Sequence, residues 1–408
     1  MEDQPGTSQT WPDLPPGPYG TLSPDIPRRH AEAPMEPATL PSGDRVPMIV
    51  RYADVRALLM SPATSRNLRL PGLPRLVRGP FLDDDPASLL NQDPPEHTRC
   101  RRITHGTFTP RNIERWRSRA AAIADELIGA AGPEFDLVAD YALPLPARVI
   151  CEMLGVPTER YVQFLGWTEL FLTTSEERNE ARIEGMAAFL DYTRELIEQH
   201  RAEPGDDLID LLVAARDGGD GLSEDELVTL VFTLILAGHE TTASMIIRGA
   251  FRLLCHPDQY AELVARPELL EPAVEEILRH EGPGSNGMLR RITADVELSA
   301  GPVPAGSVVL PNLFAADHDP AVYEDPLRFD IHRFAGAPPA PHLAFGHGPH
   351  FCLGSHLARM ELQEAFRALV TRLPGLAARE DLAAVRWTEA AFVHRPVRLL
   401  VKAGRGAG

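Results

Sequence analysis

The amino-acid sequence predicts a mainly helical protein with a small amount of β-sheet. Apolar residues recur at helical spacing along most of the chain, and the longest such run spans residues 223–255. Patterns typical of strands are few and short, and they lie at 47–52, 292–298 and 303–310. The hydrophobic content of 44% and charged content of 24% are ordinary for a globular protein with a large core.

Length, charge and cysteine content further limit what kind of protein this can be. A chain of 408 residues has on length alone room for roughly two or three domains. Its net charge of −18 argues against general nucleic-acid binding, and the alternative reading of that charge is solubility. The four cysteines show no framework spacing and no signal peptide is visible, so we expect a reducing cytoplasm. We also expect no stretch long and apolar enough to span a bilayer.

The elements before the longest helix can be read in order. A strand at 47–52 leads into a helix at 53–60, whose apolar residues share one face. Residues 68–90 are rich in Pro, Gly and Asp and predict a long loop, which is either functional or a plain surface loop. Two prolines mark a helix start near residue 94. Further helices are expected at 111–131, 141–154, 158–173, 176–201 and 207–216.

His97 and Arg101 stand four residues apart in the helix that follows these prolines. Side chains at this spacing share a helix face, so the two can act together on one ligand. Two cationic or hydrogen-bonding side chains suit a pair of carboxylates. The alternative is a solvated basic face.

The run over 223–255 predicts a buried central helix. Ser223 and Glu226 have the spacing of a capping box, and the run is apolar on most sides. Within it, Ala237-Gly238 is followed by Glu240 and Thr241. Glycine costs about 1 kcal/mol relative to alanine inside a helix, and a buried carboxylate needs a partner. Such local conflicts often mark a functional site, although a satisfied polar patch between helices is the alternative.

The later elements are a helix at 273–280, a strand at 292–298, a hairpin at 303–310 and a helix at 355–370. The first of these carries Glu276 and Arg279, three residues apart. An exposed pair at this spacing is worth only about a few tenths of a kcal/mol, so it is a weak signal alone.

The stretch from Phe345 to Gly354, Phe-Gly-His-Gly-Pro-His-Phe-Cys-Leu-Gly, places Cys352 where a glycine-rich loop enters a helix. Free N–H groups and the helix dipole favour a thiolate there. Glycines also permit close approach of a flat cofactor. One alternative is a cysteine that packs as a small hydrophobe. Another is a zinc site formed by Cys352 with neighbouring histidines, namely His347, His350 and His356.

The pattern Phe-Gly-x-Gly-x-His-x-Cys-x-Gly, complete from Phe345 to Gly354, resembles the haem-binding loop of the cytochrome P-450 family. Together with His97-x-x-x-Arg101 and Ala237-Gly-x-Glu-Thr241, the resemblance runs from about Pro47 to the end of the chain. It implies the cytochrome P-450 fold, a triangular helical prism with a small sheet lobe. We then expect one catalytic domain over 47–408. A partly loose region over 1–46 precedes it and consists of a tail, formed by about the first twenty residues, and a first helix region.

The resemblance also implies the cofactor, haem b, with Cys352 as the iron ligand. It assigns Thr241 a hydrogen bond to iron-bound oxygen and Glu240 a part in proton relay, on a helix bent over the haem. Glu276 and Arg279 would form a structural network with Arg333. The other cofactor-binding residues that it implies are His97, Arg101, Ala237, Gly238, Arg290 (with Arg291 as the neighbouring candidate), Phe345, Gly346, His350 and Gly354.

The activity implied is an O2-dependent monooxygenation, either hydroxylation or epoxidation, of a mid-sized hydrophobic molecule. By analogy with similar proteins we expect a secondary metabolite as substrate. The expected partners are a ferredoxin and its reductase, with no nucleic acid and no membrane, and the expected state is a cytoplasmic monomer. The pocket is expected to be lined by 68–90, 234–237 and 286–289, and also by 158–201, which would form its lid. A peroxide-driven enzyme or a non-oxygenating haem-thiolate protein is the alternative.

Overall fold

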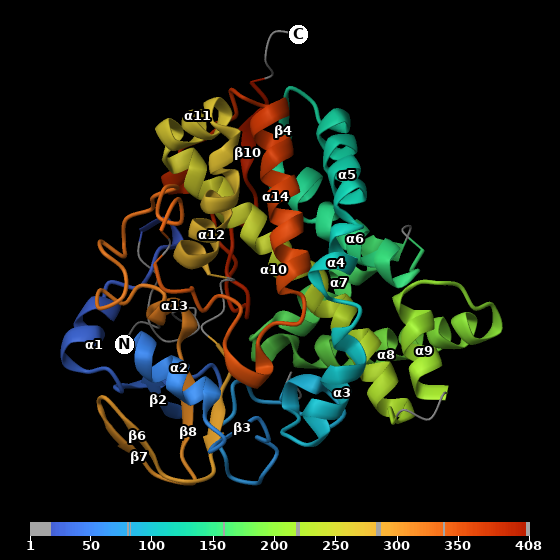
Figure 1. The fold of residues 1–408 in the computed structure, drawn as a ribbon, viewed down its shortest axis with the longest axis vertical. Helices are drawn as coiled ribbons and strands as arrows, with labels where there is room; N and C mark the ends of the chain where they lie inside the picture. The colour runs from blue at the N-terminus through green and yellow to red at the C-terminus, as the bar shows by residue number, and fades with distance from the viewer. Residues whose placement is uncertain are drawn as a thin grey trace, which may run out of the picture.

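The computed structural model describes residues 18–404 except 80, 82, 158–159, 218–220, 283–286 and 338. Figure 1 shows a roughly triangular outline in which helices fill most of the molecule and short strands gather at its base and near its top. The predicted class, mainly α with a small sheet lobe, is confirmed.

The larger helices build the body around α10. They are α3 (Glu96–His105), α4 (Pro110–Glu114), α5 (Arg117–Ala130), α6 (Pro144–Leu154), α7 (Tyr161–Leu172), α8 (Asn179–Ala202), α9 (Leu208–Asp217), α10 (Glu224–Cys255), α11 (Pro257–Ala265), α12 (Leu270–Glu281) and α14 (Ser355–Arg372). Helix α10 packs against α6, α8, α12 and α14. Its predicted capping box is present, because Ser223 and Glu226 exchange hydrogen bonds of 2.8 and 3.2 Å.

The main sheet joins distant parts of the chain. Its order is β1-β2-β8-β5-β3, in which β2 and β8 are parallel and the other neighbours antiparallel. The strands are β1 (Pro37–Thr39), β2 (Arg45–Ile49), β3 (Thr64–Ser65), β5 (Arg290–Ile292) and β8 (Val308–Pro311). Helices α1 (Ile26–Glu32), α2 (Tyr52–Met60) and α13 (Leu313–Ala316) lie in the same part of the molecule (Figure 1).

Two smaller sheets complete the strand content of the described chain. One has the order β4-β10-β9 and consists of β4 (Glu134–Asp136), β10 (Leu400–Lys402) and β9 (Ala377–Ala378). The other pairs β6 (Val296–Leu298) with β7 (Gly301–Val303).

The strand prediction was wrong in two places. The expected strand at 292–298 is broken into β5 and β6, which belong to different sheets. The expected hairpin at 303–310 does contain a turn, with Gly306 at φ +89°. However, β7 pairs with β6, while β8 pairs with β5 and β2. A turn signal thus identified a reversal of the chain without identifying which strands pair across it.

The helix prediction was wrong mainly at boundaries. The expected helix at 111–131 is divided into α4 and α5, and α6 begins at Pro144 rather than at 141. Proline has no N–H to donate and is tolerated in the first turn of a helix, which explains the later start. A π-helical turn at Val138–Ala142 precedes α6. Helix α11 was not predicted, while α1 lies in 1–46, where a first helix region was expected.

The region before Pro47 contributes to the core from residue 18 onward. Leu22, Ile26 and Leu40 are buried in the main hydrophobic cluster. The carbonyl oxygens of Tyr19 and Gly20 accept hydrogen bonds of 3.3 Å from arginines of α10. Most of the expected tail, residues 1–17, lies outside the described residues. The division into 1–46 and 47–408 stays a prediction, and strand β2 crosses it.

The expectation about membrane-spanning length was wrong for α10. This helix is long and apolar enough to meet the length and composition criterion, but 67% of its apolar window is buried inside the protein. A buried core helix satisfies the same criterion, and burial explains the composition of α10 without a bilayer.

Candidate active site

One cavity, of about 340 Å³, brings together nearly all the residues that the sequence singled out. Segments from α3, α10, β5 and the loop before α14 meet around it. Every predicted catalytic or cofactor-binding residue except Glu240 lines this cavity: His97, Arg101, Ala237, Gly238, Thr241, Arg290, Phe345, Gly346, His350, Cys352 and Gly354. Arg290, rather than the neighbouring candidate Arg291, is the arginine that faces it.

The cysteine loop, residues 344–354, is held in a compact shape by its own backbone. The Cys352 N–H donates to the Phe345 carbonyl at 2.9 Å, and the Gly346 N–H donates to Leu343 at 2.7 Å. Gly346 and Gly348 have φ of +70° and +74°, which other residues rarely adopt. A Cβ on Gly348 would also stand 2.4 Å from the carbonyl oxygen of Leu59 in α2. Glycine is therefore required here for both conformation and space.

The Cys352 side chain is exposed to the cavity and surrounded by protein on its other sides. Burial among these atoms raises the pKa of its thiol, while the Gly354 N–H and the guanidinium groups of Arg101 and Arg359 oppose the rise. A sulfur that faces the cavity on one side and accepts a hydrogen bond on the other can bind a metal ion that lies in the cavity.

The described structure does not support the zinc interpretation of this loop. Among the described residues, the only group of three or more His, Cys, Asp and Glu side chains close enough to share an ion is His200, Asp207 and Asp210, far along the chain from the loop. The rings of His350 and His97 instead lie 4.2 Å apart, and Arg56 donates to His347 at 3.2 Å.

Cationic and imidazole side chains gather at one part of the cavity. His97 is 2% exposed, and its Nε2 has no hydrogen-bond partner among the described residues. Burial and Arg101 lower the pKa of His97 to about 4, and burial and Arg290 lower that of His350 to about 2. Burial and the nearby Arg66 lower the pKa of Arg290 to about 9. Burial is the main cause of these shifts, and the neighbouring guanidinium groups add to it, so an anionic ligand would stabilise the charged forms of these side chains.

This arrangement fits a flat cofactor that carries carboxylates. The buried Nε2 of His97 is a free hydrogen-bonding atom, and the positive charge suits two anionic groups. The exposed sulfur of Cys352 would be available to bind a metal ion carried by such a cofactor. Arg66 was not singled out from the sequence. This residue lines the cavity and forms an ion pair with Asp83 at 2.6 Å.

The motif in α10 presents one face to the cavity. Ala237 and Thr241 both line it, one helical turn apart, and Thr241 Oγ1 donates to the Ala237 carbonyl at 2.9 Å. The helix is continuous through the motif, so its expected bend stays a prediction. Gly238 has a packing role that the sequence did not reveal. A Cβ there would lie 2.7 Å from the Ile150 side chain of α6.

Glu240 lies beside this face rather than on it. It is not among the lining residues, and its carboxylate pairs with the guanidinium of Arg395 at 2.8 Å. Both side chains are only 12% exposed. The partner that a buried carboxylate requires is thus supplied from the C-terminal part of the chain, which no local pattern in the sequence indicates.

The apolar part of the cavity agrees with the expected pocket only in part. Of the described residues in 68–90, only Leu89 and Leu90 line it. From 286–289, Gly287 and Met288 line it, and residue 286 lies outside the described residues. No described residue of 158–201 lines the cavity, so this part of the prediction was wrong. The lining residues missed in the apolar part include Leu230, Thr233 and Phe392.

Aromatic packing explains why α7 stays behind the cavity. The ring of Phe171 in α7 lies 6.1 Å from Phe81 and 5.5 Å from Phe232 of α10. Phe81 in turn lies 5.9 Å from Phe392, which does line the cavity. The rings of Phe81 and Phe392 therefore separate α7 from the open space.

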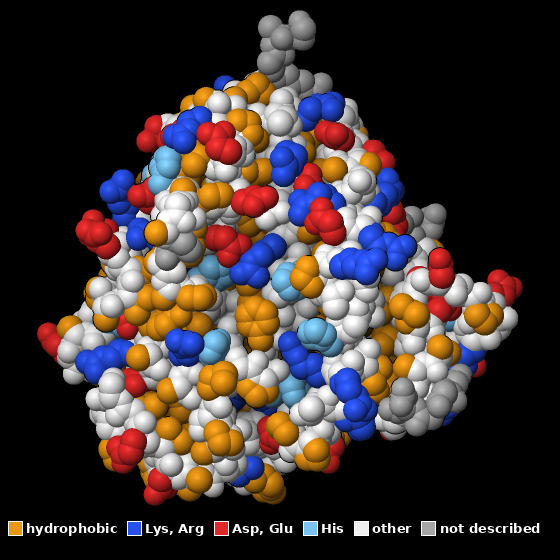
Figure 2. Space-filling model, in the orientation of Figure 1, with side chains coloured by type: hydrophobic (Ala, Val, Ile, Leu, Met, Phe, Trp, Pro, Cys, Tyr) orange, Lys and Arg blue, Asp and Glu red, His pale blue; other side chains and the backbone are white. Residues whose placement is uncertain are grey.

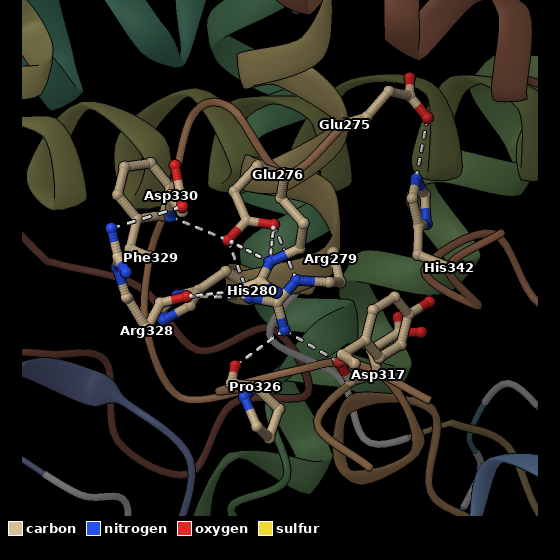
Figure 3. Close-up of polar contacts among 12 residues, drawn as sticks. Glu275, Glu276, Arg279, His280, Asp317, Pro326, Arg328, Phe329, Asp330 and His342 are labelled. Atoms are coloured by element: carbon tan, nitrogen blue, oxygen red, sulfur yellow. Dashed lines mark hydrogen bonds and ion pairs between the residues drawn. The ribbon is translucent and has the colours of Figure 1, made fainter. Parts of the chain in front are cut away.

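The predicted network of Glu276, Arg279 and Arg333 is confirmed (Figure 3 draws its core). Glu276 and Arg279 are fully buried and make two hydrogen bonds of 2.8 Å, and Arg333 Nε lies 3.1 Å from Glu276. Arg279 also donates to the Asp317 carbonyl at 3.0 Å, and the Asp317 carboxyl accepts from the Leu343 N–H at 2.6 Å. Leu343 immediately precedes the cysteine loop, so the network ends at this loop.

Glu275, the neighbour of Glu276, is a second anchor that sequence reasoning missed. It accepts from His342 at 3.0 Å and from Arg359 at 2.7 and 3.0 Å (Figure 3 shows the His342 contact). Burial opposes ionisation, but these bonds prevail and lower the pKa of Glu275 to about 2. Arg359 also lies 4.5 Å over the Phe345 ring. Glu275 thus holds both ends of the cysteine loop to α12.

Comparison with known proteins agrees with this site. The family model described as Cytochrome P450 matches residues 148–374. The mycinamicin IV hydroxylase/epoxidase of Micromonospora griseorubida is 40% identical over 374 residues, which cover 88% of this chain and 90% of that protein. The cytochrome P450 monooxygenase PikC of Streptomyces venezuelae is 40% identical over 365 residues, covering 88% and 85%.

A solved structure gives the same result for the fold. The LnmA cytochrome P450 hydroxylase from the leinamycin pathway of Streptomyces atroolivaceus matches with a TM-score of 0.83 and 38% identity, and the match covers 93% of this chain and 96% of that one. From its site, its sequence relatives and its fold, the chain belongs to the cytochrome P450 family and is a haem-dependent monooxygenase.

Proposed function

We propose that this protein uses haem b to insert one atom of O2 into a mid-sized hydrophobic molecule, by hydroxylation or epoxidation, in the tailoring of a secondary metabolite. The observation that carries the proposal is the cavity that exposes Cys352, Thr241 and a group of cationic side chains to one another. Bound haem would supply the iron centre that activates O2, chemistry that no side chain here offers.

The cofactor would be held by residues of two kinds. Cys352 would bind the iron through its sulfur, and His97, Arg101, Arg290 and His350 would contact the two carboxylates. The remaining contacts would come from small or flat residues that let the cofactor approach the backbone: Ala237, Gly238, Phe345, Gly346 and Gly354.

Thr241 and Glu240 would manage protons on the α10 side of the cavity. The Thr241 hydroxyl now donates to the Ala237 carbonyl, and it can rotate to donate into the cavity instead. Glu240 lies next to it on the helix and would pass protons to it from outside the cavity. This role requires a carboxylate close to the cavity yet separate from its apolar lining, which is where Glu240 lies.

The substrate would be bound mainly by apolar surface. The part of the cavity away from the cationic side chains is lined by Leu89, Leu230, Leu234, Met288 and Phe392. Relatives named for oxidising mycinamicin IV and for hydroxylation in leinamycin biosynthesis support a natural product as substrate. A hydrophobic lining that positions a substrate with few polar contacts suits such molecules.

We infer that electrons come from a ferredoxin and a ferredoxin reductase, and that the protein works as a monomer in the cytoplasm. Figure 2 shows basic side chains around the middle and lower right of the face on which α3, α4 and the lower end of α14 lie in Figure 1. Exposed basic residues of these elements include Arg102, Arg111 and His356. A patch of positive charge suits an acidic electron donor.

Substitution of the cysteine tests the proposal. The reduced wild-type protein with carbon monoxide should show the red-shifted absorption band of thiolate-ligated haem, and Cys352→Ala should lose it because the sulfur is gone. Cys255→Ala, which removes a cysteine outside the cavity, is the control and should keep the band.

A Cys352→Ala protein that kept this band would contradict the ligand assignment. Reductant-dependent product formation then separates the alternatives. Product formed with peroxide but never with a reductase system would favour the peroxide-driven enzyme, and an intact band without product under either condition would favour a non-oxygenating protein.

A further inference from the structure

The chain folds back on itself over residues 386–397, a segment that we call the C-terminal hairpin. Trp387 and Pro396 form an antiparallel bridge, the Val397 N–H donates to Arg386 at 2.9 Å, and the Thr388 N–H donates to Arg395 at 2.8 Å. At its base, Arg248 of α10 donates to the His394 carbonyl at 2.9 Å. The hairpin is therefore fixed to α10 by a buried side chain.

The tip of the hairpin is fixed to the end of α7. Thr173 and Ala391 form a bridge, and the Phe392 N–H donates to the Leu172 carbonyl at 2.8 Å. The Thr174 N–H donates to the Ala390 carbonyl at 2.6 Å. Because both ends are attached, the hairpin cannot shift without breaking backbone hydrogen bonds, and any side chain near its base has a defined position.

Arg395 is that side chain. Its Nε donates to Glu240 at 2.8 Å, its Nη1 donates to the Pro396 carbonyl at 3.2 Å, and its N–H donates to Thr388 Oγ1 at 3.1 Å. Of the described residues, Arg395 is the only one recorded in an ion pair with Glu240. Removal of one partner from a largely buried ion pair leaves the other charge uncompensated and forces it to move.

We propose that Arg395 is a positioning residue that fixes the Glu240 carboxylate beside the cavity, at the place from which it exchanges protons with Thr241. The inference rests on the proposed role of Glu240. It adds that the C-terminal hairpin, rather than α10 itself, determines where the carboxylate lies. Loss of the guanidinium lets the Glu240 side chain turn toward water or toward the cavity, so the electric field in the cavity changes.

The experiment uses carbon monoxide bound to the reduced holoenzyme, because its C–O stretching frequency in infrared spectra responds to charges near the cavity. The variants are Arg395→Gln, Arg395→Lys, Glu240→Gln and the double variant Arg395→Gln/Glu240→Gln. Arg398→Gln is the matched control, since Arg398 is an exposed arginine two residues beyond Pro396 with no recorded side-chain partner among the described residues. Urea unfolding of the same proteins gives a second readout that needs no turnover.

Arg395→Gln is expected to shift or broaden the C–O band, and Arg395→Lys to restore part of the wild-type frequency through its positive charge. In the Glu240→Gln background the same Arg395→Gln change is expected to produce a smaller shift, because the group that it positions has lost its charge and only the loss of the guanidinium charge remains. The unfolding midpoints of the wild type, Arg395→Gln, Glu240→Gln and the double variant form a cycle. The changes in midpoint caused by the two single substitutions should not add up to that of the double variant, as for residues in direct contact. Arg398→Gln should leave the band and the midpoint unchanged.

Two results would overturn the inference. One is a C–O band that Arg395→Gln leaves where it is in the wild type. The other is a shift that Arg395→Gln produces equally in the wild-type and Glu240→Gln backgrounds, which would show that Arg395 acts on the cavity without Glu240. Failure of the proposed function is recognised separately: the wild-type protein would then lack the thiolate-type band with carbon monoxide, or would keep the band and form no product with a reductase system.

Discussion

At the scale of a single residue, Gly348 sets how closely the cysteine loop approaches α2. Its φ of +74° is unfavourable for any side chain, and its Cα faces the carbonyl oxygen of Leu59 with no room for a methyl group. The obstructing atom belongs to the backbone of a helix and cannot rotate away. The loop therefore keeps its position only while this residue has no side chain.

Gly348→Ala should lower the free energy of unfolding by about 2 kcal/mol or more, from backbone strain and overpacking together. Gly129→Ala is the matched control. It lies within α5, where a Cβ would meet no atom within 4 Å, and it should instead stabilise the protein by about 0.5–1 kcal/mol. Urea unfolding followed by circular dichroism measures both. Equal effects of the two substitutions would show that the close approach at Leu59 is not what Gly348 is needed for.

At the scale of an element, α12 secures the cysteine loop through two adjacent acids. Glu276 is fully buried and reaches Leu343 through Arg279 and Asp317, while Glu275 binds His342 and Arg359 directly. Neighbouring residues on a helix point in different directions, so each acid serves a different attachment. The loop is thereby held on both sides by one helix.

The attachment through Glu275 should make stability depend on pH. Its pKa is lowered from 4.5 to about 2 in the folded protein, so its contribution is fully present above pH 4.5 and is lost as the pH falls toward 2. Glu275→Gln should therefore destabilise the protein by about 1–3 kcal/mol at neutral pH, and the difference from the wild type should shrink through this window.

Urea unfolding at a series of pH values measures this difference. Glu180→Gln is the control, because Glu180 is exposed in the first turn of α8 and has no recorded partner among the described residues. A destabilisation by Glu275→Gln that stays constant from neutral pH to below pH 4 would show that the carboxylate charge is not the cause.

At the scale of the whole molecule, charge is unevenly distributed. The net charge is −18, yet exposed basic side chains occur on the elements near the cysteine loop, namely α2, α3, the α4–α5 junction and α14. Figure 2 shows them on one face as separate blue and pale-blue groups. They include Arg56, Arg102, His105, Arg115 and His356. An acidic partner would be repelled by most of the molecule and attracted here.

Reversal of two of these charges, Arg102→Glu with Arg115→Glu, should slow electron transfer from an acidic [2Fe–2S] ferredoxin by about tenfold at low salt, since rim charges act mainly on association. Stopped-flow reduction under carbon monoxide measures the rate. The difference from the wild type should fall as salt is added. Arg398→Glu is the control for total charge; if it slowed reduction equally, the effect would come from net charge rather than from this face.

The sequence predicted those parts of the site that lie within one short segment. The cysteine loop, His97 with Arg101, and the motif from Ala237 to Thr241 are each local, and the structure brings them to one cavity. Contacts between residues that are far apart in sequence and are brought together only by the fold could not be predicted. Arg395 reaches Glu240 across 155 residues of sequence, and Phe392 joins the lining from the same hairpin.

The fold shows the same division. Long helices such as α8 and α10 were predicted because apolar periodicity is a local feature of the sequence. The pairing of β8 with β2 and β5 depends on strands far away in sequence, so a correct turn signal at Gly306 still gave the wrong hairpin. The lining role expected of 158–201 failed, and at the end of α7 the ring of Phe81 packs against both Phe171 and Phe392, of which Phe392 lines the cavity.

The two kinds of residue around the cavity differ in how freely they could be exchanged. The cysteine loop is tied by Glu275 and Glu276 to buried charges, so most changes near it would cost stability. Leu89, Met288 and Phe392 come from three separate segments and hold no such charges. Selection for a new substrate could therefore alter these three positions independently while the chemistry stayed intact, which makes them the natural starting points for a mutant library.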